Sequence, residues 1–335
     1  MPQPVLSSDA VIDAARGAQF SLVGVAEASP LDPAPLTGWL RSGYGAGLAA
    51  LHRKVTQRLD PCAVVPGART VIALGIPYQG TGPASAIARY AQGRDYHLTH
   101  RDRLRALRRR LRDLDPTINT YACVDAGMAM EKVWAERAGL GWIGKNSLLI
   151  TRQHGSWLTL SVMIINRSVD RYDQPHPRLC GECDLCLRAC PTKAFVGPGV
   201  LDARRCLSYH TVENRQTIPI ELRPALGDRV FGCDACQEAC PYNHANLPPG
   251  DPRQAPRPVG FMSASQIAAL SREELTRLAA GTPMARAGCD GLLRNAALVL
   301  AGKPEARRTL LRLARDTHPL VNEAARWALA QQGYS

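Results

Sequence analysis

The chain has 335 residues, of which 45 % are hydrophobic and 21 % charged, a composition typical of a soluble globular protein with two or three domains. The N-terminal residues show no basic segment followed by an apolar run, and no apolar stretch approaches the length of a membrane span. We therefore expect a cytoplasmic protein with no membrane association. The net charge of +12 favours polyanionic partners such as nucleic acid.

The first half of the chain alternates helix-like and strand-like segments. Hydrophobic periodicity and β-branched runs predict a helix over 9–20, strands over 21–28, 70–78 and 117–125, a helix over 129–139, and a hairpin over 147–166 that turns near His154 and Gly155. Strands that alternate with helices are typical of an α/β domain. We place this domain over residues 1–168.

A strongly basic segment lies inside this domain, over residues 100–113. Its leucines, beginning at Leu104 and Leu107, recur at helical spacing, which predicts an amphipathic helix with an arginine-rich outer face. Two interpretations remain open. The arginines either form an ordinary solvated helix face or face the phosphates of a polyanion.

Cysteine is the most informative residue type, since eight of the eleven cysteines fall in one segment. Four have the spacing C-x2-C-x2-C-x3-C before Pro191, and three have the spacing C-x2-C-x3-C before Pro241. This pattern is typical of bacterial ferredoxins with two [4Fe–4S] clusters, in which the cysteine before the proline ligates the other cluster. With Cys206 in place of the missing first cysteine, the rule assigns Cys180, Cys183, Cys186 and Cys240 to cluster one, and Cys190, Cys206, Cys233 and Cys236 to cluster two.

A pair of structural zinc sites is the alternative for these eight cysteines. Zinc usually takes its thiolates from two separated C-x2-C pairs, whereas three successive cysteines and a following proline fit an iron–sulfur cluster better. We predict a ferredoxin-like two-cluster domain over residues 169–245. The isolated Cys62, Cys123 and Cys289 are expected to be small buried hydrophobic residues.

The C-terminal quarter is predicted to be helical. A proline-rich linker over 246–262 precedes it, and Ser271 with Glu274 forms a capping-box pattern. Further helices are predicted over 291–302, 305–316 and 319–331. Successive helices with Leu and Ala faces are similar to HEAT repeats. We expect a short HEAT-like segment over 263–335 that packs on the rest of the protein.

Several stretches of this sequence resemble the epoxyqueuosine reductase family. They are "CVDAGMAMEKVWAERAGLGWIGKNSLLI" (123–150), "ARYAQGRDYH" (88–97), "VLDARRCLSYHTVE", "IPIELRPALGDRVFGCDACQEACPYN" and the cysteine motifs. The resemblance implies a cobalamin held in the α/β domain beside two [4Fe–4S] clusters. It also implies reduction of epoxyqueuosine to queuosine at the wobble position of tRNA, with electrons from an unidentified donor. Nothing in the sequence demands more than a monomer.

The resemblance places the proton donor at Asp125, which follows the predicted strand 117–125. A carboxylic acid useful near neutral pH needs a raised pKa, which burial beside an apolar corrin would favour. On the residues alone, the alternative is that Asp125 caps the N-terminus of the helix predicted over 129–139.

Seven further residues are candidate cobalamin contacts, and five of them have a plain structural alternative. Lys145 and Asn146 could instead form a tight turn, Tyr96 and His97 a buried hydrogen-bonded pair, and Arg58 a surface cation. Ser208 and Tyr209 lie beside Cys206 and could reach the tail of the corrinoid. No D-x-H-x-x-G motif is present, so we expect no histidine on the lower face of the cobalt.

Two other functions remain open on this sequence. A protein with two clusters could transfer electrons to a partner enzyme without catalysing a reaction itself. A corrinoid reductive dehalogenase that acts on small molecules would have the same set of cofactors. The net positive charge and the absence of an export signal favour an RNA substrate over a small halogenated one.

Overall fold

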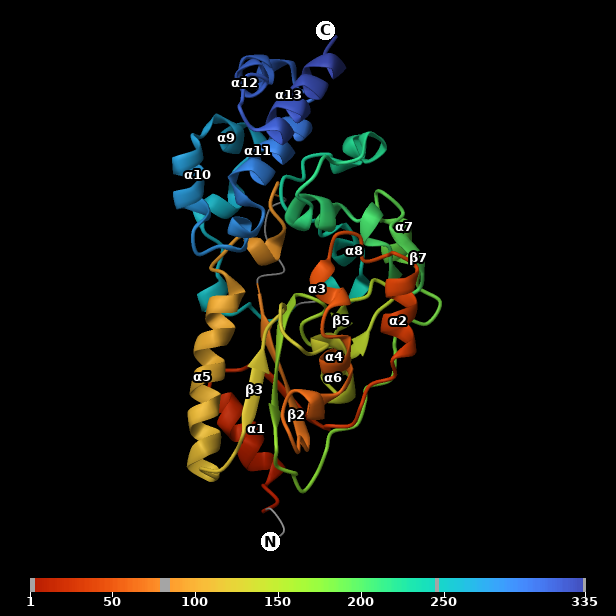
Figure 1. Cartoon of the computed structure of the whole chain (residues 1–335), viewed down its shortest axis with the longest axis vertical. Coiled ribbons are helices and arrows are strands. Elements are labelled where there is room, and N and C mark those ends of the chain that lie inside the picture. Colours follow the sequence, from red (N-terminus) through yellow and green to blue (C-terminus); the bar gives the residue numbers. More distant parts are fainter. Residues whose placement is uncertain (1–3, 79–84, 245–246, 334–335) are drawn as a thin grey trace.

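The computed structural model describes residues 4–78, 85–244 and 247–333. The N-terminal layers of sheet and helix form one end of the elongated molecule, and the C-terminal helices form the other (Figure 1). Residues 245 and 246, at the predicted boundary between cluster domain and linker, lie outside the described residues. Within the described ranges, no helix is both long enough and apolar enough to cross a membrane.

A four-stranded sheet forms the centre of the N-terminal part, with the strand order β1-β2-β6-β3. Its strands are β1 (Leu22–Glu27), β2 (Thr70–Pro77), β3 (Thr120–Cys123) and β6 (Leu158–Ile165). All neighbouring strands are antiparallel. Alternation of helices and strands in the sequence indicated the layers, but it does not determine strand direction. This sheet therefore differs from the parallel sheet typical of α/β domains.

Helices cover both faces of this sheet. Ile72 and Leu74 of β2 belong to the core shared with α1 (Ser8–Gly17) and α5 (Tyr96–Leu114). On the opposite face, the core includes Trp134 of α6 (Glu131–Arg137). Because successive strand residues point to opposite faces, every residue of β2 is buried. Shorter helices follow β1 along the chain: α2 (Ala34–Arg41), α3 (Ala49–His52) and α4 (Val55–Leu59).

The hairpin predicted over 147–166 is wrong as a strand pair. Its first part, β5 (Leu149–Ile150), pairs with β4 (Trp142–Ile143), while β6 pairs with β2 and β3. The chain does turn where predicted, since Thr151 and Gly155 form an antiparallel bridge. β6 carries apolar residues on both faces, with Thr159 and Ser161 as its polar exceptions, so it is buried more fully in the interior of the sheet than at the edge of a two-stranded ribbon.

The cysteine-rich segment has short elements. They are α7 (Leu185–Arg188), β7 (Phe195–Gly197), β8 (Val200–Leu201), a 3-10 helix (Ala203–Arg205), a π-helical turn (Tyr209–Glu213), a 3-10 segment (Ile220–Leu226) and α8 (Ala235–Glu238). Ligand loops of this kind gain little stability from secondary structure. Their packing against the neighbouring layers holds them in place.

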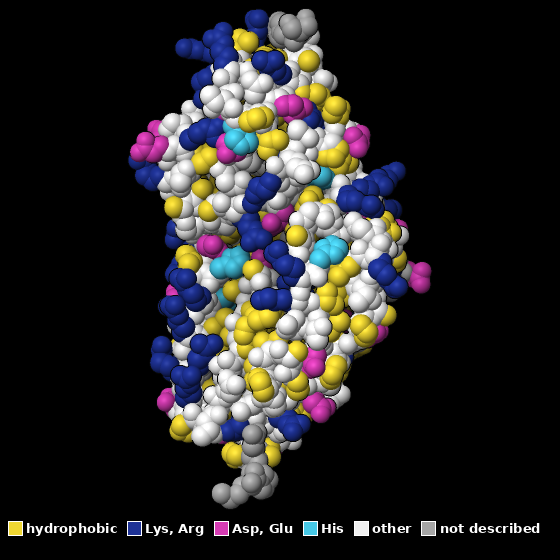
Figure 2. Space-filling model, in the orientation of Figure 1, with side chains coloured by type: hydrophobic (Ala, Val, Ile, Leu, Met, Phe, Trp, Pro, Cys, Tyr) yellow, Lys and Arg dark blue, Asp and Glu magenta, His cyan; other side chains and the backbone are white. Residues whose placement is uncertain are grey.

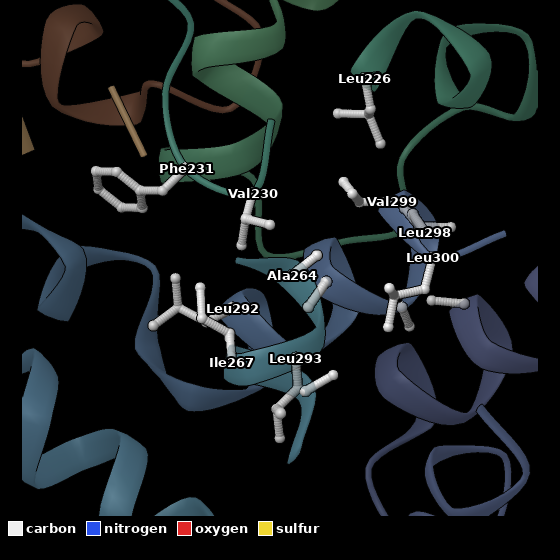
Figure 3. Close-up of a cluster of buried hydrophobic side chains, with 14 of the residues drawn as sticks. Leu226, Val230, Phe231, Ala264, Ile267, Leu292, Leu293, Leu298, Val299 and Leu300 are labelled. Carbon is white, nitrogen blue, oxygen red and sulfur yellow. The ribbon is translucent and has the colours of Figure 1, made fainter. Parts of the chain in front are cut away.

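Five helices follow near the C-terminus: α9 (Ala264–Ala269), α10 (Arg272–Ala279), α11 (Gly288–Val299), α12 (Arg307–Leu313) and α13 (Pro319–Gln331). The capping box of Ser271 and Glu274 is present at the start of α10. Leu226, Val230 and Phe231 of the cysteine-rich segment share one hydrophobic core with α9 and α11 (Figure 3). The prediction that these helices pack on the rest of the protein is therefore confirmed.

Polar contacts tie α11 to the same segment. The buried Arg294 guanidinium donates to the carbonyl oxygens of His210, Asn214 and Gln216, at 2.6 to 2.9 Å. The neighbouring Asn295 side chain donates to the carbonyl oxygens of Thr211 and Val230 at 2.9 and 2.8 Å. Burial lowers the pKa of Arg294 to about 10, so the side chain keeps its charge near neutral pH.

Candidate active site

The structure brings the eight clustered cysteines together as two groups of four. The first group is the set that the spacing assigned to cluster one, Cys180, Cys183, Cys186 and Cys240. All four line one cavity of about 280 Å³. Burial raises the pKa of Cys186, and the other three thiols raise it further. Cys183 is exposed, whereas Cys186 and Cys240 are buried.

The second group contains the four cysteines that the spacing assigned to cluster two, Cys190, Cys206, Cys233 and Cys236. Burial raises the pKa of Cys236, and the other three thiols of the group raise it further. Among the described residues, no three His, Cys, Asp or Glu side chains are placed to hold a single metal ion. The first group of thiols surrounds a space instead of converging on a point.

A second, larger cavity of about 400 Å³ lies between the sheet and the cysteine-rich segment. Cys206, Cys233 and Cys236 form part of one wall. The remaining walls come from α5, the loop after β3, the start of α6, the turn before β5 and strand β6. These elements contribute Tyr96, Asp125, Glu131, Lys132, Asn146, Leu148, Leu149, Leu158 and Leu160. Tyr78 and Tyr90, which precede α5, and Ser208, Asp234 and Gln237 of the cysteine-rich segment also line the cavity.

Asp125 lies in the loop between β3 and α6. Its φ is +58°, a left-handed conformation that is uncommon for any residue except glycine and is often found at functional sites. The N-cap of α6 is Met130, so the interpretation of Asp125 as a helix cap is wrong. The side chain is 52 % exposed and faces the cavity.

Two residues at the start of α5 contact this carboxylate. The Tyr96 hydroxyl donates to Asp125 Oδ2 at 3.1 Å, and His97 Nε2 lies 3.5 Å from the same oxygen. The other ring nitrogen of His97 lies 2.8 Å from Asp95 Oδ1. The rings of Tyr96 and His97 stack with a centroid separation of 4.2 Å. His97 therefore lies between two carboxylates.

The protonation of this group differs from the expectation. Burial raises the pKa of Asp125, but the hydrogen bond and charge of His97, together with the Tyr96 hydroxyl, outweigh burial and lower it. Burial lowers the pKa of His97, yet Asp125 and Asp95 raise it overall to about 9. The protein residues around Asp125 therefore lower its pKa, whereas burial beside a corrin was expected to raise it. At neutral pH the proton resides on His97, because charge pairing exceeds the desolvation cost.

Glu131 and Lys132 also line the cavity, and sequence reasoning did not select them. Burial raises the pKa of Glu131 to about 7, and burial lowers that of Lys132. Lys132 Nζ donates to the Ser147 carbonyl at 2.6 Å. Both residues lie at the start of the helix predicted over 129–139, six and seven positions after Asp125. The available signal was a pair of adjacent charged residues at the start of the helix that follows the Asp125 loop.

Asn146 lies on the wall of both cavities. Its side chain is buried, and its amide nitrogen has no hydrogen-bond partner among the described residues. The neighbouring Lys145 lines only the cluster-one cavity and donates to the Gly181 carbonyl at 2.6 Å. The backbone of residues 144–147 does form the tight turn that was the structural alternative for Lys145 and Asn146, since Ser147 N donates to the Gly144 carbonyl.

The remaining candidates are placed differently from one another. Ser208 lines the 400 Å³ cavity. The Tyr209 hydroxyl instead accepts a hydrogen bond from Gly47 N at 2.9 Å, outside the lining of that cavity. Arg58 is buried at 6 % exposure, which excludes a surface cation. It does not line the cavity either, although its charge lowers the pKa of Glu131.

The three isolated cysteines have different environments. Cys123 is buried, as expected, but Cys62 is exposed and Cys289 is only partly buried. The prediction of a buried hydrophobic residue is therefore wrong for Cys62. It is the second residue of a 3-10 turn (Pro61–Ala63) whose backbone is capped by Asp60, so its position is set by the turn and not by packing.

Two family models match the chain. The 4Fe-4S double cluster binding domain matches residues 179–243, which include all eight clustered cysteines. The model described as Epoxyqueuosine reductase QueG, DUF1730 matches residues 58–126. The first match supports iron–sulfur clusters in this segment over structural zinc sites.

Curated relatives match nearly the whole chain. An epoxyqueuosine reductase of Pseudomonas aeruginosa is 37 % identical, over 99 % of this chain and 96 % of that protein. An epoxyqueuosine reductase of Escherichia coli is 35 % identical, over 93 % of this chain and 86 % of that protein.

Solved structures match at similar coverage. A crystal structure of epoxyqueuosine reductase with an epoxyqueuosine-modified tRNA-Tyr stem loop has a TM-score of 0.87 at 29 % identity, covering 97 % of this chain and 90 % of that one. The epoxyqueuosine reductase of Streptococcus thermophilus has a TM-score of 0.88 at 27 % identity, with 96 % and 89 % coverage.

Proposed function

The chain belongs to the epoxyqueuosine reductase family and is an oxidoreductase of queuosine biosynthesis, and we propose that it acts on epoxyqueuosine at the wobble position of tRNA. The reaction consumes two electrons and two protons. Both carbon–oxygen bonds of the epoxide break, the oxygen leaves as water, and a carbon–carbon double bond remains. The protein must therefore supply electrons at carbon and protons at oxygen within one closed space.

One observation carries this proposal. Asp125 and three cysteines of the second group line the same cavity. A proton-handling group and an electron-carrying wall thus face each other across a space that a small reacting group can enter. A simple electron-transfer protein would have no use for such a cavity, which favours catalysis over electron transfer alone.

The residues of the cavity fit a corrinoid. Leu148, Leu149, Leu158 and Leu160 give it an apolar wall suited to the faces of a macrocycle. The buried Asn146 amide is an unpaired donor at this wall, and peripheral amides of a corrinoid offer acceptors for it. We propose that Asn146, Ser208 and these leucines hold cobalamin. When bound, the corrinoid would supply the reducing centre at carbon, with the two clusters as its electron relay.

Proton delivery falls to the residues at the start of α5. A protonated His97 holds Asp125 ionised, and the departing oxygen is a stronger base than this carboxylate. Because the proton at this site resides on His97, we assign Asp125 the role of a relay. As the carbon–oxygen bond breaks, His97 gives its proton to Asp125 and Asp125 gives a proton to the departing oxygen, while solvent supplies the second proton of the water that leaves. Tyr96 keeps the carboxylate oriented through its hydroxyl. General acid catalysis of this kind typically contributes about 10²- to 10⁴-fold in rate.

A related structure supports the role of the Asp125 loop. An epoxyqueuosine reductase structure from Bacillus subtilis, 28 % identical with a TM-score of 0.85, has an aspartate catalytic loop swung out of the active site. In this chain the corresponding feature would be the loop that carries Asp125 in its left-handed conformation. We propose that the loop moves in the same way to admit the substrate nucleotide.

The remaining candidates are assigned more remote roles. Lys145, next to the first cysteine group, would stabilise the loop of cluster one through Gly181. Tyr209 would fix the segment after Cys206 through Gly47, and Arg58 would balance the charge of Glu131 from below the cavity. The α/β part over 1–168 would hold the corrinoid, the part over 169–245 the clusters, and the HEAT-like part over 263–335 would support both.

The test is turnover of a defined RNA. The chain, purified without oxygen and supplied with cobalamin and a strong reductant, should convert epoxyqueuosine to queuosine in an anticodon stem loop, measured by nucleoside mass spectrometry. A strain without the protein should accumulate epoxyqueuosine. Reduction of small halogenated compounds without any conversion of the RNA would instead favour the dehalogenase alternative.

A further inference from the structure

A groove lined with arginines lies beside the loop of Asp125. It has a volume of about 280 Å³ and runs between helix α5 and strand β3. His97, Leu98, Arg101, Leu104, Arg105 and Arg108 of α5 form one side, and Ala122, Cys123 and Val124 form the other. β3 is the edge strand of the sheet, so the groove is bounded by a helix on one side and by a sheet edge on the other.

The groove begins at the catalytic group. His97, at its first end, contacts Asp125, and Val124 precedes Asp125 in the chain. The three arginines follow His97 at positions +4, +8 and +11, which places them on one side of the helix. From Arg101 to Arg108 the helix rises by about 10 Å. The groove thus extends from the reacting group along the surface of the protein.

Every charged side chain that lines the groove is cationic. The groove contains three arginines and a histidine with a raised pKa, and none of its lining residues is acidic. Arg101 and Arg105 are exposed and form no ion pair with any described residue. Asp102, the acidic residue closest in sequence, is paired with Arg94 at 3.0 Å. Figure 2 shows Lys and Arg side chains gathered along the edge of the molecule where α5 lies.

We propose that this groove binds the sugar–phosphate backbone of the tRNA strand next to the epoxyqueuosine nucleotide, with Arg101 and Arg105 as its phosphate contacts. The proposal rests on the function proposed above. Guanidinium groups match phosphate oxygens with two parallel hydrogen bonds. A nucleotide that enters the cavity leaves its flanking phosphates outside it. The groove that the two arginines line begins at His97, which contacts Asp125 on the cavity wall.

The same helix supplies a matched control. Arg109 and Arg110 are exposed and line a different cavity, which they share with Gly17 and Ala106. They carry the same charge on the same helix but do not line the α5–β3 groove. Non-specific attraction of a basic protein for RNA would involve both pairs equally, whereas a specific groove would involve only Arg101 and Arg105.

The experiment compares two double variants, R101Q/R105Q and R109Q/R110Q. Binding of an unmodified, fluorescently labelled anticodon stem loop is measured by anisotropy as a function of KCl concentration. Turnover of the epoxyqueuosine-containing stem loop is measured in parallel. Circular dichroism and the cluster absorbance confirm that both variants are folded and loaded.

We expect R101Q/R105Q to weaken RNA binding roughly tenfold at low salt and to reduce the slope of log K against log[salt] by about 1 to 2, because each lost phosphate contact releases fewer counterions. Its KM should rise while kcat at saturation stays within about twofold, since phosphate contacts position the RNA. The control pair should match the wild type. Equal losses in both pairs, or none in R101Q/R105Q, would overturn the proposal.

The two proposals fail separately. Wild-type protein that converts epoxyqueuosine while both variants bind RNA normally retains the proposed function and rejects the groove. Wild-type protein that does not convert it, with a selective loss of binding in R101Q/R105Q, retains the groove and rejects the reaction.

Discussion

Replacement of Asp95 by asparagine should shift the pH dependence of the enzyme. Asp95 lies 2.8 Å from His97 Nδ1, and it also caps α5 by accepting from His97 N at 2.9 Å. Asparagine caps helices about as well as aspartate. The variant therefore removes one of the two negative charges beside His97 while the start of the helix is retained.

The magnitude follows from the two carboxylates that act on His97. Together they raise its pKa from 6.5 to about 9, against the effect of burial. Loss of one should lower the pKa by roughly 1 unit, since a close carboxylate contributes about this much or more. Protonated His97 is the source of the proton that Asp125 relays, so activity should fall as pH rises through about 9 in the wild type and about one unit lower in the variant.

Stability should follow the same direction. Because the pKa of His97 is raised in the folded state, its protonation stabilises the folded protein. This contribution is fully present below pH 6.5 and disappears as pH rises through about 9. The assay is kcat/KM for the epoxyqueuosine stem loop between pH 6 and 10, with ¹³C NMR of labelled histidine as an independent readout. An alkaline limb that stays in place in Asp95→Asn, while the NMR titration of His97 moves, would refute the role of His97 in proton supply.

Three further predictions concern the cavity and the clusters. Asp125→Asn should retain both clusters, seen by absorbance and EPR, and should bind hydroxocobalamin, but should lose about 10²-fold or more in turnover; near-normal turnover would remove Asp125 from proton transfer. Glu131→Gln should raise the free energy of unfolding by roughly 1–3 kcal/mol at pH 8 and by less at pH 5. The pKa of Glu131 is raised to about 7 in the folded state, so ionisation of this carboxyl destabilises the folded protein as pH rises from about 4.5 through 7. A change in Tm that does not depend on pH would contradict a buried carboxyl at this position. Cys183→Ser and Cys206→Ser should each reduce the iron content from about eight to about four atoms per chain, and loss of all iron from either variant would show that the clusters do not assemble separately.

The sequence contained enough information for the cysteine groups and for the position of Asp125. Spacing alone grouped Cys190 with Cys233 and Cys236, because the geometry of a cubane restricts which loop can supply each thiolate. The position of Asp125 followed from a strand end and from family resemblance. These features depend on local order along the chain, which a sequence shows directly.

The ionisation of the site could not be predicted in the same way. Asp125 and His97 are 28 positions apart, and only the packing of α5 beside β3 brings them within 3.5 Å. Burial alone would raise the pKa of Asp125, but the nearby His97 lowers it overall. The direction and pairing of the strands also could not be predicted. From the sequence, β6 resembles one half of a hairpin, and only the structure shows that β2 pairs with its whole length.

The contact between α11 and the cysteine-rich segment has a consequence for maturation of the protein. Arg294 and Asn295 hold the backbone from His210 to Val230, the stretch that connects Cys206 to Cys233. We therefore expect insertion of the second cluster and packing of the C-terminal helices to be cooperative. A polypeptide shortened before residue 288 should emerge from the ribosome unable to retain iron at this position, and apo-protein should expose its C-terminal helices to proteases first.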